Sequence, residues 1–221
     1  MKNIIETKKE KLQIAAFGYG MFLVVFASLV FFLSGSFLHL MLIWNICLAF
    51  VPLYISTKLS KKKSTMNILL WIIWLLFIPN TFYMITDVIH LQQISFIELS
   101  NPYEYTYIKD ISIWLELVNI LLCVSTGVIF GMMSMQNVKK VIKGKSYMLL
   151  LPFISIASGI AIYIGRFLRF NSWDILQPIS LLQRLYANMD FFAIQYILLF
   201  SGIIFFINIG YYVLKHYIYI D

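Results

Sequence analysis

The chain has 221 residues, of which 61% are hydrophobic and only 12% are charged, and its formal net charge is +7. A soluble domain is about 45–50% apolar and about 25% charged, so the composition excludes a soluble globular protein and indicates one integral membrane domain over residues 1–221. The positive charge lies in short lysine clusters between apolar segments. That placement is a membrane-orientation signal, and we predict no nucleic-acid partner.

Six apolar segments are each about 20 residues long, enough to cross a hydrocarbon core of about 30 Å. The predicted spans are residues 12–33, 37–57, 66–88, 111–134, 147–168 and 189–213. The predicted fold class is therefore all-α, a polytopic membrane bundle of six transmembrane helices. The first span is longer than the apolar core of a signal peptide, so we interpret it as retained. Ser34-Gly35-Ser36 predicts a tight turn that makes the first two spans antiparallel neighbours.

The lysines predict how the spans are oriented. With six spans, thirteen lysines fall at one end, and only Lys109, Arg166, Arg169 and Arg184 fall at the other. The positive-inside rule then predicts a multi-pass protein of the plasma membrane with both termini in the cytoplasm. Cys47 and Cys123 lie within apolar segments and are interpreted as core residues.

The segment Trp71–His90 begins as an apolar helix and ends in groups that can do chemistry. Asn80, Tyr83, Asp87 and His90 are spaced i, i+3, i+7 and i+10, which on a continuous α-helix places them in a stripe about 80° wide. Pro79 predicts a kink or a break just before them. Asp87 and His90 can touch along the helix, as in an acid/base pair.

Counting along each span places most ionisable groups of the membrane region at one level, near the outer boundary. These groups are His39, Asp87, His90, Glu116, Arg166, Arg169 and Asp174. Ionisable groups at membrane depth usually pair or serve a function. The predicted pairs join either arginine to Asp87, Glu116 or Asp174. The group is either a structural ion-pair network or a polar pocket open to the outer leaflet, and its spacing predicts no metal site.

Two long outward loops complete the chain. Residues 91–110 contain Asn101-Pro-Tyr-Glu-Tyr-Thr-Tyr, which predicts a tyrosine-rich turn at the level of the lipid headgroups. In residues 174–188, apolar residues recur at helical spacing, with Pro178 in the first turn. They are Ile175, Ile179, Leu182 and Tyr186. This pattern predicts a short amphipathic helix on the outer surface.

Two stretches carry a resemblance to a known family. Residues 77–91 contain Pro-Asn-x-x-Tyr-x-x-Thr-Asp-x-x-His, and residues 165–174 contain Gly-Arg-x-x-Arg-x-x-Ser-Trp-Asp. In these motifs the chain resembles a bacterial family of predicted membrane proteins, catalogued as domain of unknown function 1361, over most of its length. The resemblance implies that the motif residues form one site: Asn80, Tyr83, Asp87, His90, Arg166, Arg169, Trp173 and Asp174.

Three functional hypotheses follow. In the first, an enzyme performs acyl or phosphoryl chemistry on a lipid or a lipid-linked substrate, with Asp87 and His90 as catalytic residues. Its binding residues would be Asn80, Tyr83, Glu116, Arg166, Arg169, Trp173 and Asp174. In the second, a small transporter uses Pro79-Asn80 as a broken-helix binding point. In the third, a non-enzymatic membrane subunit binds a protein partner. Membrane lipids surround the chain in all three, and the sequence indicates neither a specific substrate nor a cofactor.

Overall fold

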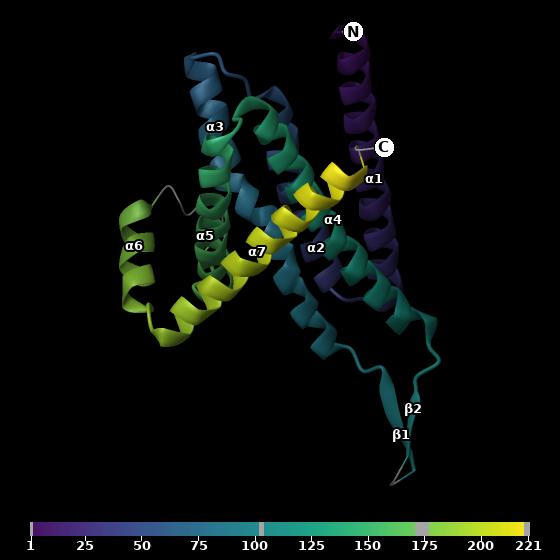
Figure 1. The fold of residues 1–221 in the computed structure, drawn as a ribbon. Helices are drawn as coiled ribbons and strands as arrows, with labels where there is room; N and C mark the ends of the chain where they lie inside the picture. The colour runs from purple at the N-terminus through teal and green to yellow at the C-terminus, as the bar shows by residue number, and fades with distance from the viewer. Residues whose placement is uncertain (1, 102–103, 171–176, 219–221) are drawn as a thin grey trace.

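A computed structural model describes residues 2–101, 104–170 and 177–218 as a bundle of long helices with a small hairpin at one end (Figure 1). The long helices are α1 (Lys2–Ser34), α2 (Leu38–Lys58), α3 (Thr65–Tyr83), α4 (Ile111–Val141), α5 (Lys145–Phe167) and α7 (Phe191–Ile218). The shorter elements are the 3₁₀-helix η1 (Met84–Gln93), the strands β1 (Ile97–Asn101) and β2 (Glu104–Tyr107), and α6 (Pro178–Ala187).

The predicted fold class is confirmed, because within the described residues six helical stretches are long and apolar enough to cross a membrane. Several helices exceed the predicted bounds. Helix α4 continues past residue 134 to Val141, and α1 begins already at Lys2. These extensions are polar, and hydropathy finds only the apolar part of a helix. The turn at Ser34-Gly35-Ser36 is also present. Gly35 has a φ of +68°, a backbone conformation that glycine adopts without strain because it has no Cβ.

The third span, predicted over residues 66–88 with a kink or a break at Pro79, changes its helix type further along. Helix α3 does not break at Pro79; it runs four residues further to Tyr83 and then tightens into η1. A 3₁₀-helix turns about 120° per residue instead of about 100°. Asp87 is therefore rotated by roughly 80° from its position on a continuous α-helix, and the predicted single stripe of polar residues does not form.

Glycines allow α4 to pack closely on the junction of α3 and η1. A Cβ added to Gly131 would lie 2.6 Å from Thr81 Oγ1, and one added to Gly127 would lie 2.6 Å from Met84 Sδ. The junction is thus held against α4 while its other side remains available to α2 and α5. This packing fixes where the polar residues of η1 lie.

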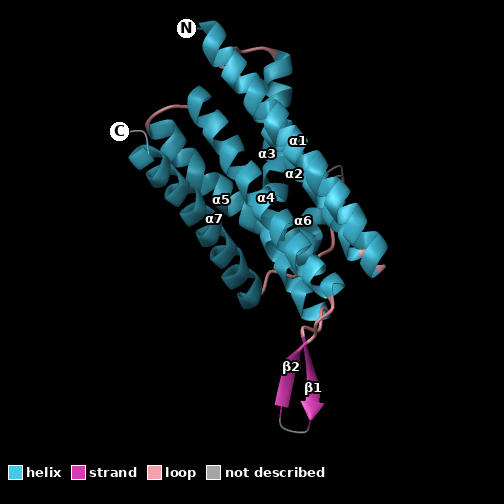
Figure 2. Cartoon of the chain, turned by 90° about the vertical axis from the view of Figure 1, so that its right-hand side faces the viewer, coloured by secondary structure: helices cyan, strands magenta, loops and turns pink. Residues whose placement is uncertain are grey.

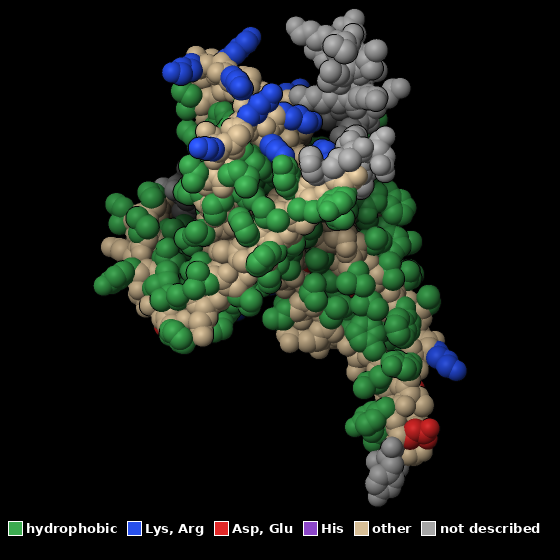
Figure 3. All heavy atoms as spheres, viewed as in Figure 1, with side chains coloured by type: hydrophobic (Ala, Val, Ile, Leu, Met, Phe, Trp, Pro, Cys, Tyr) green, Lys and Arg blue, Asp and Glu red, His purple; other side chains and the backbone are tan. Residues whose placement is uncertain are grey.

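The two ends of the bundle differ in charge. Figure 3 shows most of the Lys and Arg side chains of this face gathered at the end where both termini lie in Figure 1, and one near the base of the hairpin. This lysine-rich end carries the α2–α3 loop, with Lys61, Lys62 and Lys63, and the α4–α5 loop, with Lys143. The opposite end carries η1, the hairpin and α6 (Figures 1 and 2).

The loop predicted to contain a tyrosine-rich turn includes a β-hairpin that projects beyond the helices (Figure 2), and residues 102–103 of the predicted turn lie outside the described residues. Its strands pair Ile97 with Tyr107 and Leu99 with Tyr105. An isolated hairpin is marginal in water, and Trp114 of α4 supports this one at its base. The Trp114 ring lies 5.7 Å from that of Phe96, and its Nε1 donates a 3.0 Å hydrogen bond to the carbonyl of Ile108.

The predicted amphipathic helix is present as α6, with Pro178 in its first turn; residues 174–176 lie outside the described residues. The predicted apolar stripe faces away from the bundle, with Ile179, Leu182 and Tyr186 exposed. Leu185 faces inward instead and packs beside Tyr163 and Ala193. Helix α6 is therefore apolar on two sides, as expected of a helix between protein and lipid.

Candidate functional site

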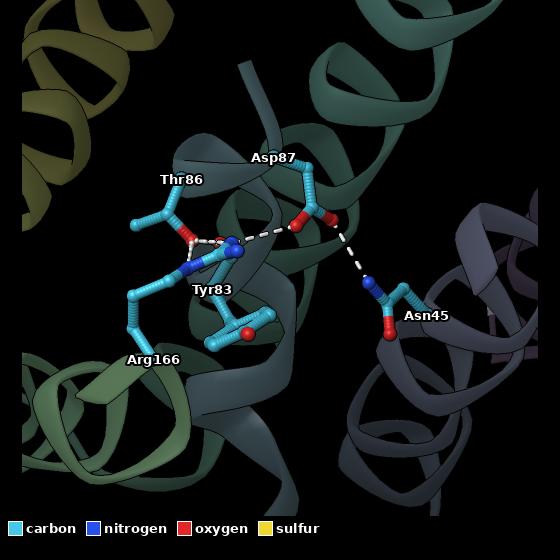
Figure 4. A network of polar contacts seen from close by, with 5 residues as sticks. All are labelled: Asn45, Tyr83, Thr86, Asp87 and Arg166. Atoms are coloured by element: carbon cyan, nitrogen blue, oxygen red, sulfur yellow. Dashed lines mark hydrogen bonds and ion pairs between the residues drawn. The ribbon is translucent and has the colours of Figure 1, made fainter. Parts of the chain in front are cut away.

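Asp87 is the centre of a polar network that joins three elements at the end opposite the lysines (Figure 4). Its side chain is fully buried. Arg166 Nη2, from α5, lies 2.7 Å from Asp87 Oδ1, and Asn45 Nδ2, from α2, donates a 2.8 Å hydrogen bond to Oδ2. Of the predicted pairs, the structure therefore contains the one between Arg166 and Asp87, and it links α2, η1 and α5.

Arg166 is held on several sides. Its Nε donates a 3.2 Å hydrogen bond to Thr86 Oγ1, and its Nη2 donates to the same oxygen. The guanidinium also lies over the Tyr83 ring, 4.8 Å from the centroid, in cation–π geometry. Thr86 in turn donates a 2.7 Å hydrogen bond to the carbonyl of Tyr83. The Arg166 guanidinium is therefore bonded to Asp87 and Thr86 and stacked on Tyr83, all within the protein.

The close approach of α5 to Tyr83 depends on Gly165. A Cβ at this position would lie 3.0 Å from Tyr83 Cε2, closer than an ordinary contact. Gly165 therefore allows the ring to sit flat beside α5, under the guanidinium of the next residue. Gly165 and Arg166, which are adjacent in the sequence motif, both contact the Tyr83 ring.

His39 and Glu116 form a second polar group, between α2 and α4, at the same end. His39 is fully buried and its Nε2 lies 3.4 Å from Glu116 Oε2. Its Nδ1 lies 2.8 Å from Asn119 Nδ2, and Cys123 Sγ lies 3.6 Å from Asn119 Oδ1. Glu116 thus pairs with His39, so the predicted pairing of Glu116 with an arginine is wrong.

His90 and Asp87 do not form the predicted acid/base contact. The carboxylate oxygens of Asp87 bond to Arg166 and Asn45, while both ring nitrogens of His90 are buried and have no hydrogen-bond partner of ordinary geometry. Asp87 and His90 share one face of η1, because side chains at i and i+3 eclipse in a 3₁₀-helix. The carboxylate is instead bonded to Arg166 and Asn45, which engage one oxygen each.

An interhelical pocket of about 420 Å³ adjoins the network, between α2, α3 and α5. Met41, Trp44, Leu48, Leu76, Pro79, Ala161, Ile162, Ile164, Phe170 and Leu181 supply its apolar lining. Its polar lining consists of Asn45, Asn80, Tyr83 and Arg169. Asn45 and Tyr83 thus face both the network and the pocket, so the two are parts of one site.

Arg169 is placed at the pocket by an unusual backbone conformation. Helix α5 ends at Phe167, and Arg169 follows with a φ of +57°, in the left-handed region. Among the described residues, no carboxylate lies within ion-pair distance of its guanidinium. Trp173 and Asp174, the other predicted binding residues of this motif, lie outside the described residues.

Sequence reasoning did not identify Asn45. The available signal was a single amide in the apolar run of the second span, where an unpaired polar group is costly. Its partner lies 42 residues away, which no local pattern indicates. Within the described residues, no three His, Cys, Asp or Glu side chains gather to hold a metal ion.

Comparison with known proteins gave one match. A family model described as protein of unknown function (DUF1361) matches residues 44–208. That range contains Asn45, both sequence motifs and every residue that lines the pocket except Met41. No curated protein and no solved structure matches the chain.

Proposed function

The chain belongs to the DUF1361 family, and we propose that it binds a lipid or a lipid-linked molecule in the interhelical pocket. The observation that carries this proposal is the lining: apolar side chains surround the pocket, and Arg169 is the charged residue among those that line it. Small-molecule sites commonly combine an apolar wall with a few polar groups that fix orientation.

The membrane setting favours a lipid over a soluble ligand. Trp44 and Met41 line the pocket and are also exposed on the outside of the helices, at 53% and 37%. In a six-span bundle such side chains face acyl chains. A lipid tail can therefore pass sideways between α2 and α5 without crossing water.

The positive-inside rule favours the outer leaflet for this ligand. The pocket is bounded by the last turns of α3 and α5, and both helices begin at the lysine-rich end. The positive-inside rule predicts that the lysine-rich end is cytoplasmic, together with both termini. Arg169 then lies where the headgroups of the outer leaflet begin.

The buried ion pair has a positioning role in this proposal. Asp87 and Arg166 neutralise each other and hold Tyr83 and Asn45 against the pocket. Asp87 is fully buried, bonds to Arg166 and Asn45, and is not among the residues that line the pocket. This arrangement favours binding over the acid/base chemistry expected of Asp87.

Catalysis on the bound lipid is the second candidate, favoured by His90. Its buried ring nitrogens lack hydrogen-bond partners of ordinary geometry, and an imidazole in that state can accept a proton. A change in the lipids of a deletion strain that wild type restores, and His90→Gln does not, would support this candidate.

The binding proposal is tested by filling the pocket. Ala161 of α5 lines it, so Ala161→Trp should reduce the lipid that co-purifies in detergent by at least about tenfold, measured by mass spectrometry. Ile156→Trp is the matched control, because Ile156 is on the same helix, is 50% exposed and lies away from the pocket. Unchanged lipid in Ala161→Trp would refute the proposal.

A further inference from the structure

We infer that the ligand of the interhelical pocket is a lipid with a single negative charge, a phosphodiester or a carboxylate, held by Arg169. This inference rests on the proposed function and specifies the ligand class. It follows from three features: the single charged side chain among the described residues of the pocket lining, the position of Arg169 at a helix end, and the apolar volume of the pocket.

Among the described residues that line the pocket, Arg169 carries the one charge that can face a ligand. Arg166 is 2.7 Å from Asp87, and Glu116 is 3.4 Å from His39. Among the described residues, Arg169 has no carboxylate partner, and no acidic residue lines the pocket. A singly charged oxyanion matches this balance, because one guanidinium fork can bind one phosphate or carboxylate through two parallel hydrogen bonds.

The end of α5 disfavours a ligand with more charge. The last carbonyl groups of a helix carry partial negative charge, and Arg169 follows the last residue of α5 by two positions. A second negative charge would face these carbonyls without a second cationic side chain among the described residues of the pocket lining. Arg166 cannot supply it, because its guanidinium is bound to Asp87 and Thr86.

The apolar part of the pocket requires a hydrocarbon chain. About 420 Å³ is available beneath Arg169, and most of the residues that enclose it are apolar. A soluble anion would contact the guanidinium and leave that volume unfilled. We therefore expect a lipid to bind more tightly than a soluble anion of the same charge.

The test is a binding series with purified wild type in detergent, followed by native mass spectrometry. Phosphatidylglycerol and palmitate carry one negative charge, phosphatidylcholine is zwitterionic, phosphatidic acid and a polyprenyl diphosphate carry more charge, and glycerol phosphate has no chain. We expect at least one of the two singly charged lipids to bind about tenfold more tightly than all the others.

Two substitutions at Arg169, one at Asp87 and a control at Lys109 test which residue determines the selectivity. Arg169→Gln should remove the preference over phosphatidylcholine, whereas Arg169→Lys, which keeps the charge, should retain part of it. Lys109→Gln removes a charge from the same end of the molecule outside the pocket and should change nothing. Asp87→Asn leaves Arg166 uncompensated and should shift preference toward phosphatidic acid.

The outcomes separate this inference from the proposed function. If wild type binds lipids but does not prefer a single negative charge, or if Arg169→Gln keeps the preference, the inference is wrong while lipid binding stands. If lipid binding is equally strong in Ala161→Trp and wild type, the pocket itself is not the binding site. Tight binding of glycerol phosphate would replace the lipid by a soluble anion.

Discussion

Both oxygens of the Asp87 carboxylate are engaged inside the bundle, one by the guanidinium of Arg166 and the other by the amide of Asn45. Transfer of two charges into a bundle interior is costly, so such a pair adds little net stability compared with apolar residues. Removal of one partner alone is strongly destabilising, because it leaves the other charge buried without a counter-charge.

We therefore predict that Asp87→Ala lowers the free energy of unfolding by about 3–5 kcal/mol, measured by denaturant unfolding in detergent. The double variant Asp87→Leu with Arg166→Met removes both charges and should lose less. Glu98→Ala on the exposed hairpin serves as a control without effect. Equal losses in the single and the double variant would contradict a paired role.

Gly165 and Gly202 form a matched pair of helical glycines. A Cβ at Gly165 would press on the Tyr83 ring at 3.0 Å, whereas one at Gly202 of α7 would meet no atom within 4 Å. Gly165→Ala should thus destabilise by about 1–3 kcal/mol, while Gly202→Ala should stabilise by up to about 1 kcal/mol. Thermal unfolding of both variants in one detergent tests the difference in sign.

At the scale of elements, the change from α3 to η1 decides which polar residues meet. Asn80 and Tyr83 are still on the α-helix and face the pocket, while Asp87 is past the change in pitch and faces Arg166 and Asn45. A stretch of 3₁₀-helix within a longer helix often marks a functional position.

Helix α4 begins with a side-chain cap that is sensitive to pH. The backbone amide and the hydroxyl of Ser112 both donate to Asp110 Oδ1, and these hydrogen bonds lower the pKa of Asp110. A lowered pKa means that the cap stabilises the folded state above the usual pKa of an aspartate, and that this contribution disappears as the pH falls through the lowered value.

We predict that Asp110→Ala speeds hydrogen exchange of the Ser112 amide at pH 7 and leaves it nearly unchanged at a pH well below the pKa of Asp110. Asp110→Asn should retain protection at both pH values, because an asparagine side chain also caps a helix. Equal acceleration at both pH values in Asp110→Ala would show that the carboxylate does not act as this cap.

At the scale of the whole molecule, the predicted topology can be tested by labelling from one side of the membrane. Cysteine at position 105, on the hairpin, should react with a membrane-impermeant maleimide in intact cells. Cysteine at position 62, at the lysine-rich end, should react only after permeabilisation. Both are placed in a background with Cys47→Ser and Cys123→Ser, and the reverse pattern would invert the orientation.

The sequence predicts the spans well and the contacts between them only in part. Span length and hydropathy are local properties, so six spans can be recognised without a structure. The pairing of Arg166 with Asp87 was one of several open options, because depth along two helices restricts pairs but does not select one. The role of Asn45 depends on the rotation of α2 against η1, which is a long-range property.

The separation of Asp87 and Arg166 along the chain has a consequence for biogenesis. The two residues are 79 positions apart, which at about 5–20 residues per second corresponds to roughly 4–16 s of synthesis. Asn45 has already been made when Asp87 leaves the ribosome, and Arg166 has not. The amide is therefore the first partner available to the carboxylate in the nascent membrane protein, and the arrival of α5 completes the ion pair.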